Sequence, residues 1–349
     1  ADTTTGKALV KINGKACGEY AFDSLAIDGY EITYTPSASA KMHVDGISAF
    51  VKKPYPADYV PEPVIPESDD YYVGINVCSL WRTGITHRGW DVIASYPEIE
   101  PVLGYYDEGT PEVADWEIKF MAEHGIDYQL FCWYADEIID KPIYRTDFND
   151  ALIDGYMNAR YSDKMDFAIM WENAVTTKCS TEAFINYVVP YWIEYFFKDD
   201  RYVKLDNKPL VAVFNYTNLG NYFGGAEKAK ENLDYLRNEC IKAGFDGCEI
   251  WAYYSGDYTE AVAETLKTYG FDGMCVYGWG ADGADVNYQL DKITKQGNVK
   301  TLGTVPTISV GFDYVGWGNS EKRNGLLDPA DFSTLSDYVK NNILAKRDS

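Results

Sequence analysis

Carboxylates stand at or near the ends of three strand-like runs, where they could do acid–base chemistry. Glu172 follows the apolar run "DFAIMW", Glu249 lies within "CEIWAYY", and Asp313 ends "TISVGFD". Acid–base catalysis uses carboxyl groups whose surroundings keep one protonated and another ionised near neutral pH. The sequence therefore makes Glu172, Glu249 and Asp313 candidate catalytic residues. For Glu172 the alternatives are a sugar ligand and a plain loop charge.

Aromatic and amide side chains follow the same runs and are suited to hold a carbohydrate. Aromatic residues make up 15% of the chain, with 30 Tyr, 15 Phe and 9 Trp. A sugar presents C–H faces that stack on rings and hydroxyls that need paired donors and acceptors. For any single ring, the alternative is that it only caps the core. The residues expected to bind substrate are Trp81, Arg82, Trp133, Tyr134, Trp171, Asn173, Asn215, Tyr216, Trp251, Tyr253, Trp279 and Trp317.

Seven β-rich runs must position these side chains, each separated from the next by enough residues to hold a helix. Helix-end signals lie between the runs, such as Thr110-Pro111 before one helix and Thr259 before another. The segments "HGID", "AGFD" and "YGFD" each close a helix with Gly and enter a strand through Asp. Alternating strands and helices predict a parallel sheet. The runs cover residues 71–81, 126–134, 166–174, 209–216, 246–254, 272–280 and 305–313.

The predicted fold class is α/β, with a (β/α)8 TIM-type barrel. No Gly-rich phosphate loop follows the first run, which favours a barrel over a doubly wound sheet. In a barrel the site lies at the C-terminal ends of the strands, so the run ends should converge on one mouth. Seven strands are readable, and an eighth should begin where the sequence stops at Ser349.

Strand alternation gives Glu249 and Asp313 different places in such a barrel. Glu249, Trp251 and Tyr253 share one face of their run. A carboxylate on the helix side would be buried without a partner, so Glu249 should point into the barrel, low in its interior. There it is either a structural polar group or part of a site. Asp313, at the mouth, is the better ligand candidate.

The N-terminal part of the chain has a different rhythm. Residues 1–53 form short β-rich runs broken by Gly or Asp-Gly, which predicts a small β-sandwich-like module. Five prolines, interleaved with acids, fall within residues 54–69 and disfavour both helix and ladder. We predict a β module over 1–53, a linker over 54–69 and the barrel domain over 70–349.

Composition and charge exclude several classes of partner. The net charge of −23 would repel nucleic acid, and no Lys/Arg cluster reverses it locally. No apolar run approaches the roughly 20 residues of a membrane-spanning helix. The sequence starts Ala-Asp, which fits a mature secreted protein or a trimmed chain, so an extracellular or cell-surface location is expected. A polysaccharide or glycan is the expected partner.

The cysteines and histidines give no sign of a metal site or a disulfide framework. The seven cysteines show no C-x-x-C spacing, so buried thiols are the expected state. The three histidines, His43, His87 and His124, lack metal-ligand spacing. Asp136 and Glu137 follow the second run, where a solvated loop charge is the simpler role. We expect no metal and no cofactor.

Four long segments carry a family resemblance. They are "YPEIEPVLGYYDEGTPEVADWEIKFMAEHGIDYQLFCWY", "FFKDDRYVKLDNKPLVAVFNY", "GFDGMCVYGWGADG" and "VPTISVGFDYVGWGNSEKRN". With them, the stretch from about 71 to 349 resembles glycoside hydrolase family 99, the endo-α-mannosidases, and still more its WbsX-like relatives from polysaccharide gene clusters. The resemblance implies a barrel with an endo-acting, retaining hydrolase activity on a polysaccharide or glycan.

The same resemblance bears on Glu172. Glu172-Asn173 falls where the endo-mannosidases carry Glu-Pro-Tyr and the WbsX-like proteins carry Asn-Glu-Asn-Trp, which implies a place for Glu172 in the sugar pocket. Ala174 departs from the aromatic residue of both groups. The family's catalytic carboxylates belong to an Asn-Glu-Trp-x-Glu-Gly motif at the eighth strand. This sequence contains no Asn-Glu-Trp.

Three explanations of the missing motif stay open. The chain is part of a longer enzyme whose eighth strand follows Ser349, since a barrel without one strand exposes two sheet edges. Alternatively, it is a non-catalytic module that binds glycan or serves as an extracellular structural unit. In the third, another pair, such as Glu172 with Asp313 or Glu249, does the acid–base work.

Overall fold

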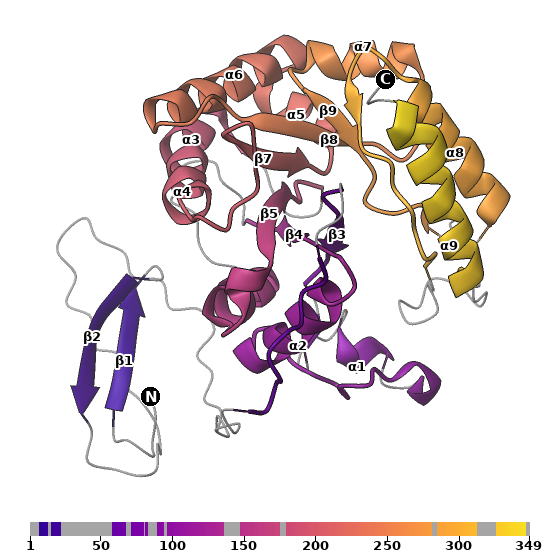
Figure 1. The fold of residues 1–349 in the computed structure, drawn as a ribbon. Coiled ribbons are helices and arrows are strands. Elements are labelled where there is room, and N and C mark those ends of the chain that lie inside the picture. Colours follow the sequence, from indigo (N-terminus) through magenta and orange to yellow (C-terminus); the bar gives the residue numbers. More distant parts are fainter. Residues whose placement is uncertain are drawn as a thin grey trace. The chain divides into compact units, whose positions relative to one another are not determined.

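The protein divides into two compact units, Ala1–Ala57 and Asp58–Ser349. In the first unit the described residues form an antiparallel hairpin of β1 (Lys7–Ile12) and β2 (Lys15–Ala21), with an irregularity between Val10 and Lys11 (Figure 1). The other strands predicted for this module lie outside the described residues. The computed structural model describes residues 7–12, 15–21, 58–67, 71–79, 81–82, 89–93, 96–135, 147–174, 179–280, 285–312 and 326–346.

A parallel sheet organises the second unit. Its strands follow one another in chain order, β3-β4-β5-β7-β8-β9-β10, and each pairs in parallel with its neighbours. A doubly wound sheet would reverse its order at a switch point, and this sheet does not. The chain therefore has the predicted TIM-type (β/α)8 class of fold. The strands are β3 (Gly74–Val77), β4 (Tyr128–Trp133), β5 (Asp166–Trp171), β7 (Lys208–Val213), β8 (Glu249–Tyr253), β9 (Gly273–Cys275) and β10 (Gly303–Thr304).

The sheet curls toward closure. The Asn76 Nδ2 of β3 donates to the carbonyl oxygens of Val276 at 3.1 Å and Tyr277 at 2.9 Å, just after β9. In a flat sheet of this strand order, β3 and β9 would lie far apart, because neighbouring strands are about 4.8 Å apart. The side-chain bond therefore crosses the concave side of the sheet. A short strand, β6 (Lys204–Leu205), pairs antiparallel with β7 outside this order.

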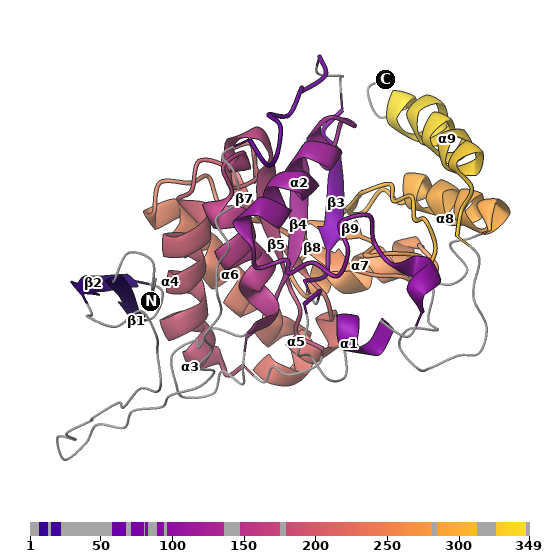
Figure 2. The ribbon, with the colours of Figure 1, turned by 90° about the horizontal axis from the view of Figure 1, so that it is seen from below.

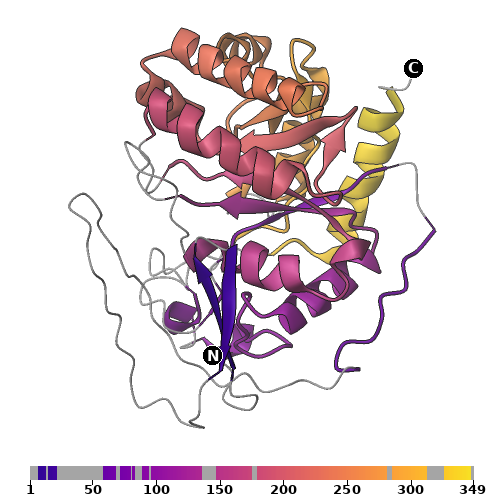
Figure 3. The same cartoon turned by 90° about the vertical axis from the view of Figure 1, so that its left-hand side faces the viewer.

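Helices cover the outer side of the sheet, as Figure 2 and Figure 3 show. A helical run of α and π turns, from Thr181 to Phe197, joins α3, η6, α4 and η7. Among the described residues, no helix combines the length and apolar character that a membrane crossing requires. The longer helices are α2 (Pro111–Ala122), α5 (Tyr216–Phe223), α6 (Ala226–Lys242), α7 (Glu260–Thr268), α8 (Val286–Asn298) and α9 (Pro329–Tyr338).

Short elements connect these helices and strands. Pro111 starts α2 after Thr110, as predicted, and the Thr259 side chain caps α7 by accepting from the Val262 amide at 3.3 Å. The remaining short helices are α1 (Trp90–Ile93), η1 (Pro97–Ile99), η2 (Asp147–Asn149), η3 (Ala151–Gly155), η4 (Tyr156–Asn158), η5 (Ser162–Lys164), α3 (Thr181–Ala183), η6 (Phe184–Val188), α4 (Val189–Trp192), η7 (Ile193–Phe197), η10 (Val339–Ile343) and η11 (Leu344–Lys346).

The repeated Gly-apolar-Asp turns join helix to strand through the aspartate. The Asp127 carboxylate accepts from the Val73 amide at 2.6 Å, and the Asp272 carboxylate accepts from the Ile250 amide at 3.0 Å. Gly125 and Gly270 take φ of 77° and 93°, a region that favours glycine. The predicted αβ turn is thus a repeated unit, and in two of its three copies the aspartate carboxylate binds the backbone of a neighbouring segment.

The last predicted run is wrong as a strand. Residues 305–312 form no strand, and β10 pairs only at Gly303–Thr304. Two buried glutamines of α8 replace the missing ladder. Gln289 accepts from the Ser309 amide at 2.9 Å and donates to the Ser309 carbonyl at 2.6 Å. Gln296 accepts from the Thr307 amide at 3.2 Å and donates to the Val305 carbonyl at 3.1 Å.

Part of the predicted linker packs on the barrel unit. Val60 is buried in the main core, and its carbonyl accepts from the Tyr161 hydroxyl at 3.1 Å. The Val64 amide donates to the Glu123 carboxylate at 2.9 Å. Proline prevents a ladder in this segment but does not prevent docking through apolar side chains. Residues 58–67 therefore belong to the second unit, which starts at Asp58.

Candidate functional site

One face of each strand points to the barrel interior, and the register identifies it. Tyr128 pairs with Asp166, and Leu210 pairs with Glu249, so these residues share the face that carries Asn76. Following the same alternation to the C-terminal ends gives the residues that can meet at the mouth. They are Cys78 after β3, Cys132 and Tyr134 at β4, Glu172 after β5, Phe214 after β7, Tyr253 of β8 and Tyr277 after β9.

Five of these residues form one connected group, here called the Glu172 cluster: Cys78, Cys132, Tyr134, Glu172 and Tyr277. The Cys78 Sγ lies 3.4 Å from the Tyr134 hydroxyl. A hydrogen bond with Cys78, and then burial, raises the pKa of the Cys132 thiol well above its usual range. Burial, and then the neighbouring Cys132 and Cys78, raise the pKa of Tyr134, with Glu172 adding to the effect. These groups therefore remain protonated donors beside the Glu172 carboxylate.

Tyr277 connects the cluster to the opposite strands. Burial, followed by the neighbouring Cys78 and Cys132, raises the pKa of Tyr277. Its ring stands edge-on to Phe214 at 5.9 Å and to Tyr253 at 6.4 Å. Phe214 and Tyr253 stack on each other at 4.7 Å with 15° between planes. Aromatic rings from three strands thus adjoin the Glu172 cluster, in which Glu172 itself is 5% exposed.

Buried asparagines fix the ends of the strands that carry the cluster. Asn173 accepts from the Asn215 amide at 2.7 Å and donates to the Asn215 carbonyl at 2.9 Å. Asn149 makes the same two bonds to Tyr134, at 2.8 Å and 2.7 Å. The carbonyl oxygen of Asn173 also accepts from the Tyr222 hydroxyl at 2.6 Å. These bonds hold the backbone on both sides of Glu172, so Asn173 and Asn215 have structural roles.

Tyr222 of α5 also lies near Glu172, since its hydroxyl binds the carbonyl oxygen of the next residue, Asn173. Burial, and then the Glu172 charge, raise the pKa of Tyr222 to about 12. The Glu172 amide continues the ladder by donating to the Trp133 carbonyl at 2.9 Å. Glu172 therefore lies on a fixed strand end, near enough to Tyr134 and Tyr222 for its charge to raise the pKa of both.

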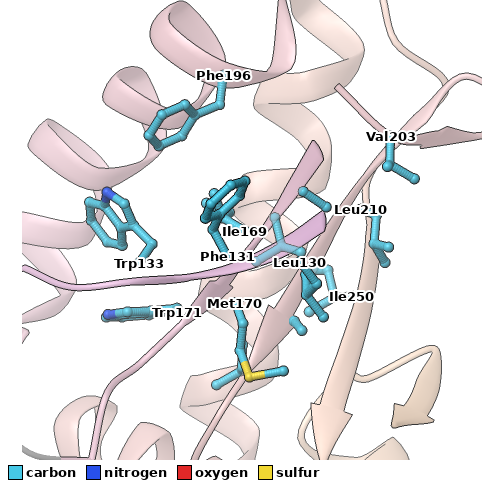
Figure 4. Packing of buried hydrophobic residues seen from close by; sticks show 14 of the residues in the cluster. Leu130, Phe131, Trp133, Ile169, Met170, Trp171, Phe196, Val203, Leu210 and Ile250 are labelled. Atoms are coloured by element: carbon cyan, nitrogen blue, oxygen red, sulfur yellow. The ribbon is translucent and has the colours of Figure 1, made fainter. Parts of the chain in front are cut away.

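The prediction that Trp133 and Trp171 line the mouth is wrong. Both lie on the outer face, because each is one residue out of phase with the inner positions. They are 1% and 0% exposed and stand edge-on to Trp192 of α4 at 5.4 Å and 5.5 Å. Figure 4 shows both rings on the helix side of the sheet together with Phe196, and Met170 projecting the other way.

Trp279 and Tyr216 pack against different groups of residues, and neither lies with Trp133 and Trp171. Trp279 is buried and donates through Nε1 to the Thr307 carbonyl at 2.9 Å, with Tyr258 and Tyr288 around it. Tyr216 starts α5 and packs edge-on to Tyr269 of α7 at 5.3 Å. The expected convergence of Trp133, Trp171, Tyr216 and Trp279 on one opening is therefore wrong.

Trp81 and Arg82 lie after β3 and are half-buried. The Trp81 ring packs on Trp90 at 4.5 Å, and its amide donates to the Glu108 carboxylate at 2.9 Å. Arg82 forms an ion pair with Asp150 at 2.6 Å. Both predicted ligands are thus bound to neighbouring loops, and the Arg82 charge is balanced by an acid.

Glu249 and Trp251 share the inner face but lie low in the barrel, as predicted for Glu249. The Trp251 Nε1 donates to Glu249 Oε1 at 3.0 Å, and burial raises the pKa of Glu249. By register, Glu249 stands level with Ala168. Glu172 is four residues farther along, or about 13 Å at the usual strand rise. Paired glycosidase carboxyls lie roughly 5 to 9.5 Å apart, so Glu172 and Glu249 do not form such a pair.

The remaining sequence predictions have mixed outcomes. Asp313, Trp317, Asp136 and Glu137 lie outside the described residues. Five described cysteines are buried thiols, as predicted, and Cys78 is half-buried. Within the described part of the chain, no group of His, Cys, Asp or Glu could hold a metal ion.

The sequence interpretation missed Cys78, Cys132, Phe214 and Tyr277. All four lie on the inner face, which the pairing of neighbouring strands identifies. Alternation within one run does not give this face, because it does not relate one strand to the next.

The chain is similar to known proteins in sequence and in fold. The family model described as "Glycosyltransferase WbsX" matches residues 95–315. No curated protein sequence matches the chain. The fold is similar to a structure of the GH99 endo-alpha-mannosidase from Bacteroides thetaiotaomicron, at 15% identity and a TM-score of 0.46 over 69% of this chain and 66% of that one. A structure of the same enzyme in complex with bis-tris-propane is 15% identical, with a TM-score of 0.47. The match covers 78% of this chain and 79% of that one.

Proposed function

Because the chain belongs to the WbsX family, we propose that it acts on a glycan at the C-terminal ends of its strands, with Glu172 as the central carboxylate. The observation that supports this best is the Glu172 cluster, a buried carboxylate surrounded by tyrosine and cysteine donors and by the Phe214–Tyr253 stack. Sugar recognition needs this combination of aromatic surface and hydrogen-bonding groups.

The proposed reaction is hydrolysis within a sugar chain, of an α-mannosidic or similar linkage, outside the cell. Glu172 supplies one carboxyl group, and hydrolysis requires a second within about 9.5 Å. Glu249 lies too low to supply it. Asp313, which lies outside the described residues, is the candidate that the sequence offers for this role. The similarity to the endo-alpha-mannosidase structures suggests the linkage to test first.

Transfer from a nucleotide-sugar has less support from the described strand ends. A diphosphate is best met by cationic groups or by helix N-termini with exposed amides. Arg82 is engaged by Asp150, and the Glu172 cluster contains an acid, two thiols and two phenols. With a net charge of −23, the chain would repel such a donor unless it is compensated locally.

The second candidate function is glycan binding without turnover. The observation in its favour is that Glu172 has no second inner-face carboxylate within glycosidase distance among the described strands. The same cluster would then hold the sugar, with the carboxylate accepting hydroxyl hydrogen bonds. The two functions predict the same binding and differ in product.

The test measures α-mannan binding and the release of reducing ends by the same preparation. Glu172→Gln keeps the side-chain shape and removes the charge, and we expect it to weaken binding about tenfold or to abolish release. The matched control is Glu194→Gln, an exposed acid paired with Lys198 on the outer helix run. Binding and release that are equal in wild type and Glu172→Gln would reject the proposal. Binding without release would leave the binding function alone.

A further inference from the structure

A hollow of about 540 Å³ opens at the opposite end of the strands from the Glu172 cluster. Its walls are the segment that enters β3, the turn between α2 and β4, and the residues that precede β5. In a parallel sheet these are all N-terminal strand ends. The volume falls within the range of roughly 300 to 1,000 Å³ that small-molecule sites occupy.

Tyr72 presents a rigid aromatic surface in this hollow. It is 49% exposed, yet its ring stacks on the ring of Tyr128 at 5.0 Å with 22° between planes. Its hydroxyl donates to the Asp166 carboxylate at 2.6 Å. One face of the ring is therefore covered and its tip is tied down, so little side-chain entropy remains to be lost when a ligand stacks on it.

Carboxylates stand beside this ring. Asp127 accepts from the Val73 amide at 2.6 Å, and Asp166 accepts from Tyr72. A carboxylate has two oxygens with about four lone-pair sites, so both acids retain the capacity to accept hydroxyl hydrogen bonds. The arrangement is an aromatic platform next to two acceptors, which suits the C–H face and the hydroxyl edge of a sugar ring.

Charge selects the kind of sugar. The lining includes Glu67, Glu123, Asp127, Asp163 and Asp166, and its lysine, Lys164, is paired with Asp163 at 3.0 Å. A uronic acid or a sulfated sugar would be repelled by this surface. A neutral sugar chain would not be repelled.

We propose that this hollow is a second saccharide-binding site for a neutral glycan, with Tyr72 as the stacking platform and Asp127 and Asp166 as hydroxyl acceptors. The proposal rests on the proposed function, since it concerns another part of the same class of polymer. A long chain that reaches both ends of the barrel would bind more tightly than a short one, because the second contact is intramolecular.

The experiment is calorimetric titration of wild type and variants with α-mannotetraose, together with affinity electrophoresis in gels that contain α-mannan. Wild type should show two classes of site for the tetrasaccharide. Tyr72→Ala should remove one class and weaken retention by α-mannan about tenfold. Glu172→Gln should affect the other class. The matched control is Tyr195→Ala, a tyrosine that is 50% exposed and packs on Tyr191 at 4.7 Å on the outer helix run.

A second variant guards against misfolding. Tyr72→Phe keeps the ring on Tyr128 and loses only the hydrogen bond to Asp166, so it should reduce binding less than Tyr72→Ala does. Unchanged binding by both Tyr72 variants would overturn the second site and leave the proposed function standing. If binding depends on Tyr72 and is unchanged in Glu172→Gln, the second site stands and the proposed function at Glu172 is overturned. Equal loss in the Tyr195→Ala control would also overturn the second site.

Discussion

The two ends of the barrel use polar side chains for different purposes. At the C-terminal ends, polar and aromatic side chains from β3, β4, β5 and β9 meet one another in the Glu172 cluster. At the N-terminal ends, Asp127 and Asp272 bind backbone amides of neighbouring strands. Below the mouth, the rings of Tyr128 and Trp251 fill the interior. In the described strands, titratable side chains therefore contact one another at the C-terminal ends, and aspartates hold the backbone at the N-terminal ends.

Glycines make room for the large rings of Tyr128 and Trp251 in the barrel interior, which is here called the filled end. A Cβ on Gly74 would lie 2.1 Å from the Tyr128 ring, and a Cβ on Gly273 would lie 2.6 Å from the Trp251 ring. The large rings of one strand therefore lie directly over glycines of the next. No such clash defines the Glu172 cluster, whose members meet through hydrogen bonds and ring edges.

The largest expected effect is a loss of stability at the C-terminal ends of the strands, where the Glu172 cluster lies. Asn173→Ala removes two hydrogen bonds from a fully buried amide, so we expect a loss of about 3 kcal/mol in the free energy of unfolding. Urea denaturation measures it. The control is Asn158→Ala, an exposed amide that donates to the carbonyls of Ile153 and Asp154. Similar losses in both variants would contradict the role of Asn173 as a buried clamp.

The next effect tests the filled end directly. Gly273→Ala drives a Cβ into Trp251, and we expect a loss of about 2 kcal/mol, which Trp251→Leu in the same chain should partly restore. Gly303 pairs with Gly273 in the register, and a Cβ there meets nothing nearer than 3.8 Å. Gly303→Ala should therefore be close to neutral. A melting temperature equally lowered by both alanines would argue against the packing explanation.

A smaller effect on glycan binding should distinguish Tyr253, near the mouth, from Trp251, deeper along the same strand. Tyr253 and Trp251 share the inner face of β8, two residues apart, and Tyr253 stacks on Phe214 near the mouth. Tyr253→Ala should weaken binding of α-mannotetraose about tenfold at the Glu172 site, and Trp251→Ala should leave it near wild type. Circular dichroism checks that both variants fold. Equal weakening would mean that the sugar reaches deeper than the mouth.

The smallest effect is a pH dependence at the filled end. Burial raises the pKa of Glu249 above its usual 4.5, so the folded chain holds this proton when the unfolded chain has lost it. Stability contributed by this group therefore falls as pH rises from 4.5 through the raised value. Glu249→Gln should flatten that slope by less than about 1 kcal/mol, because the group is only half-buried. Urea midpoints across the acid range measure it, and an unchanged slope would contradict the role of Glu249.

Much of the fold could be predicted from the alternation of strand-like and helix-like segments and from the residues that start and end helices. Strand–helix alternation, the Gly-apolar-Asp turns and the Thr110 and Thr259 starts predicted the parallel order, because local patterns specify elements and their sequence. The sequence also placed Glu249 correctly, since a carboxylate on the helix side has no solvent. Residues 305–309 do not form the predicted strand, because the glutamine side chains of α8 take up their backbone hydrogen bonds.

The site was harder to predict. Trp133 and Trp171 end their strands as expected, but a one-residue change of phase turns them to the helices. Glu172 is predictable from the sequence because it directly follows an apolar run, at a strand end. Cys78 and Tyr277 could not be weighed without the curvature of the sheet, which brings residues about two hundred positions apart into contact.

The two glutamines of α8 have a consequence for how this barrel can change. Gln289 and Gln296 hold residues 305–309 entirely through main-chain atoms. The Thr307 and Ser309 hydroxyls add only local bonds, to the Val305 carbonyl at 3.1 Å and from the Gly311 amide at 3.4 Å. The path of this segment is therefore set by α8 more than by the side chains that the segment itself carries.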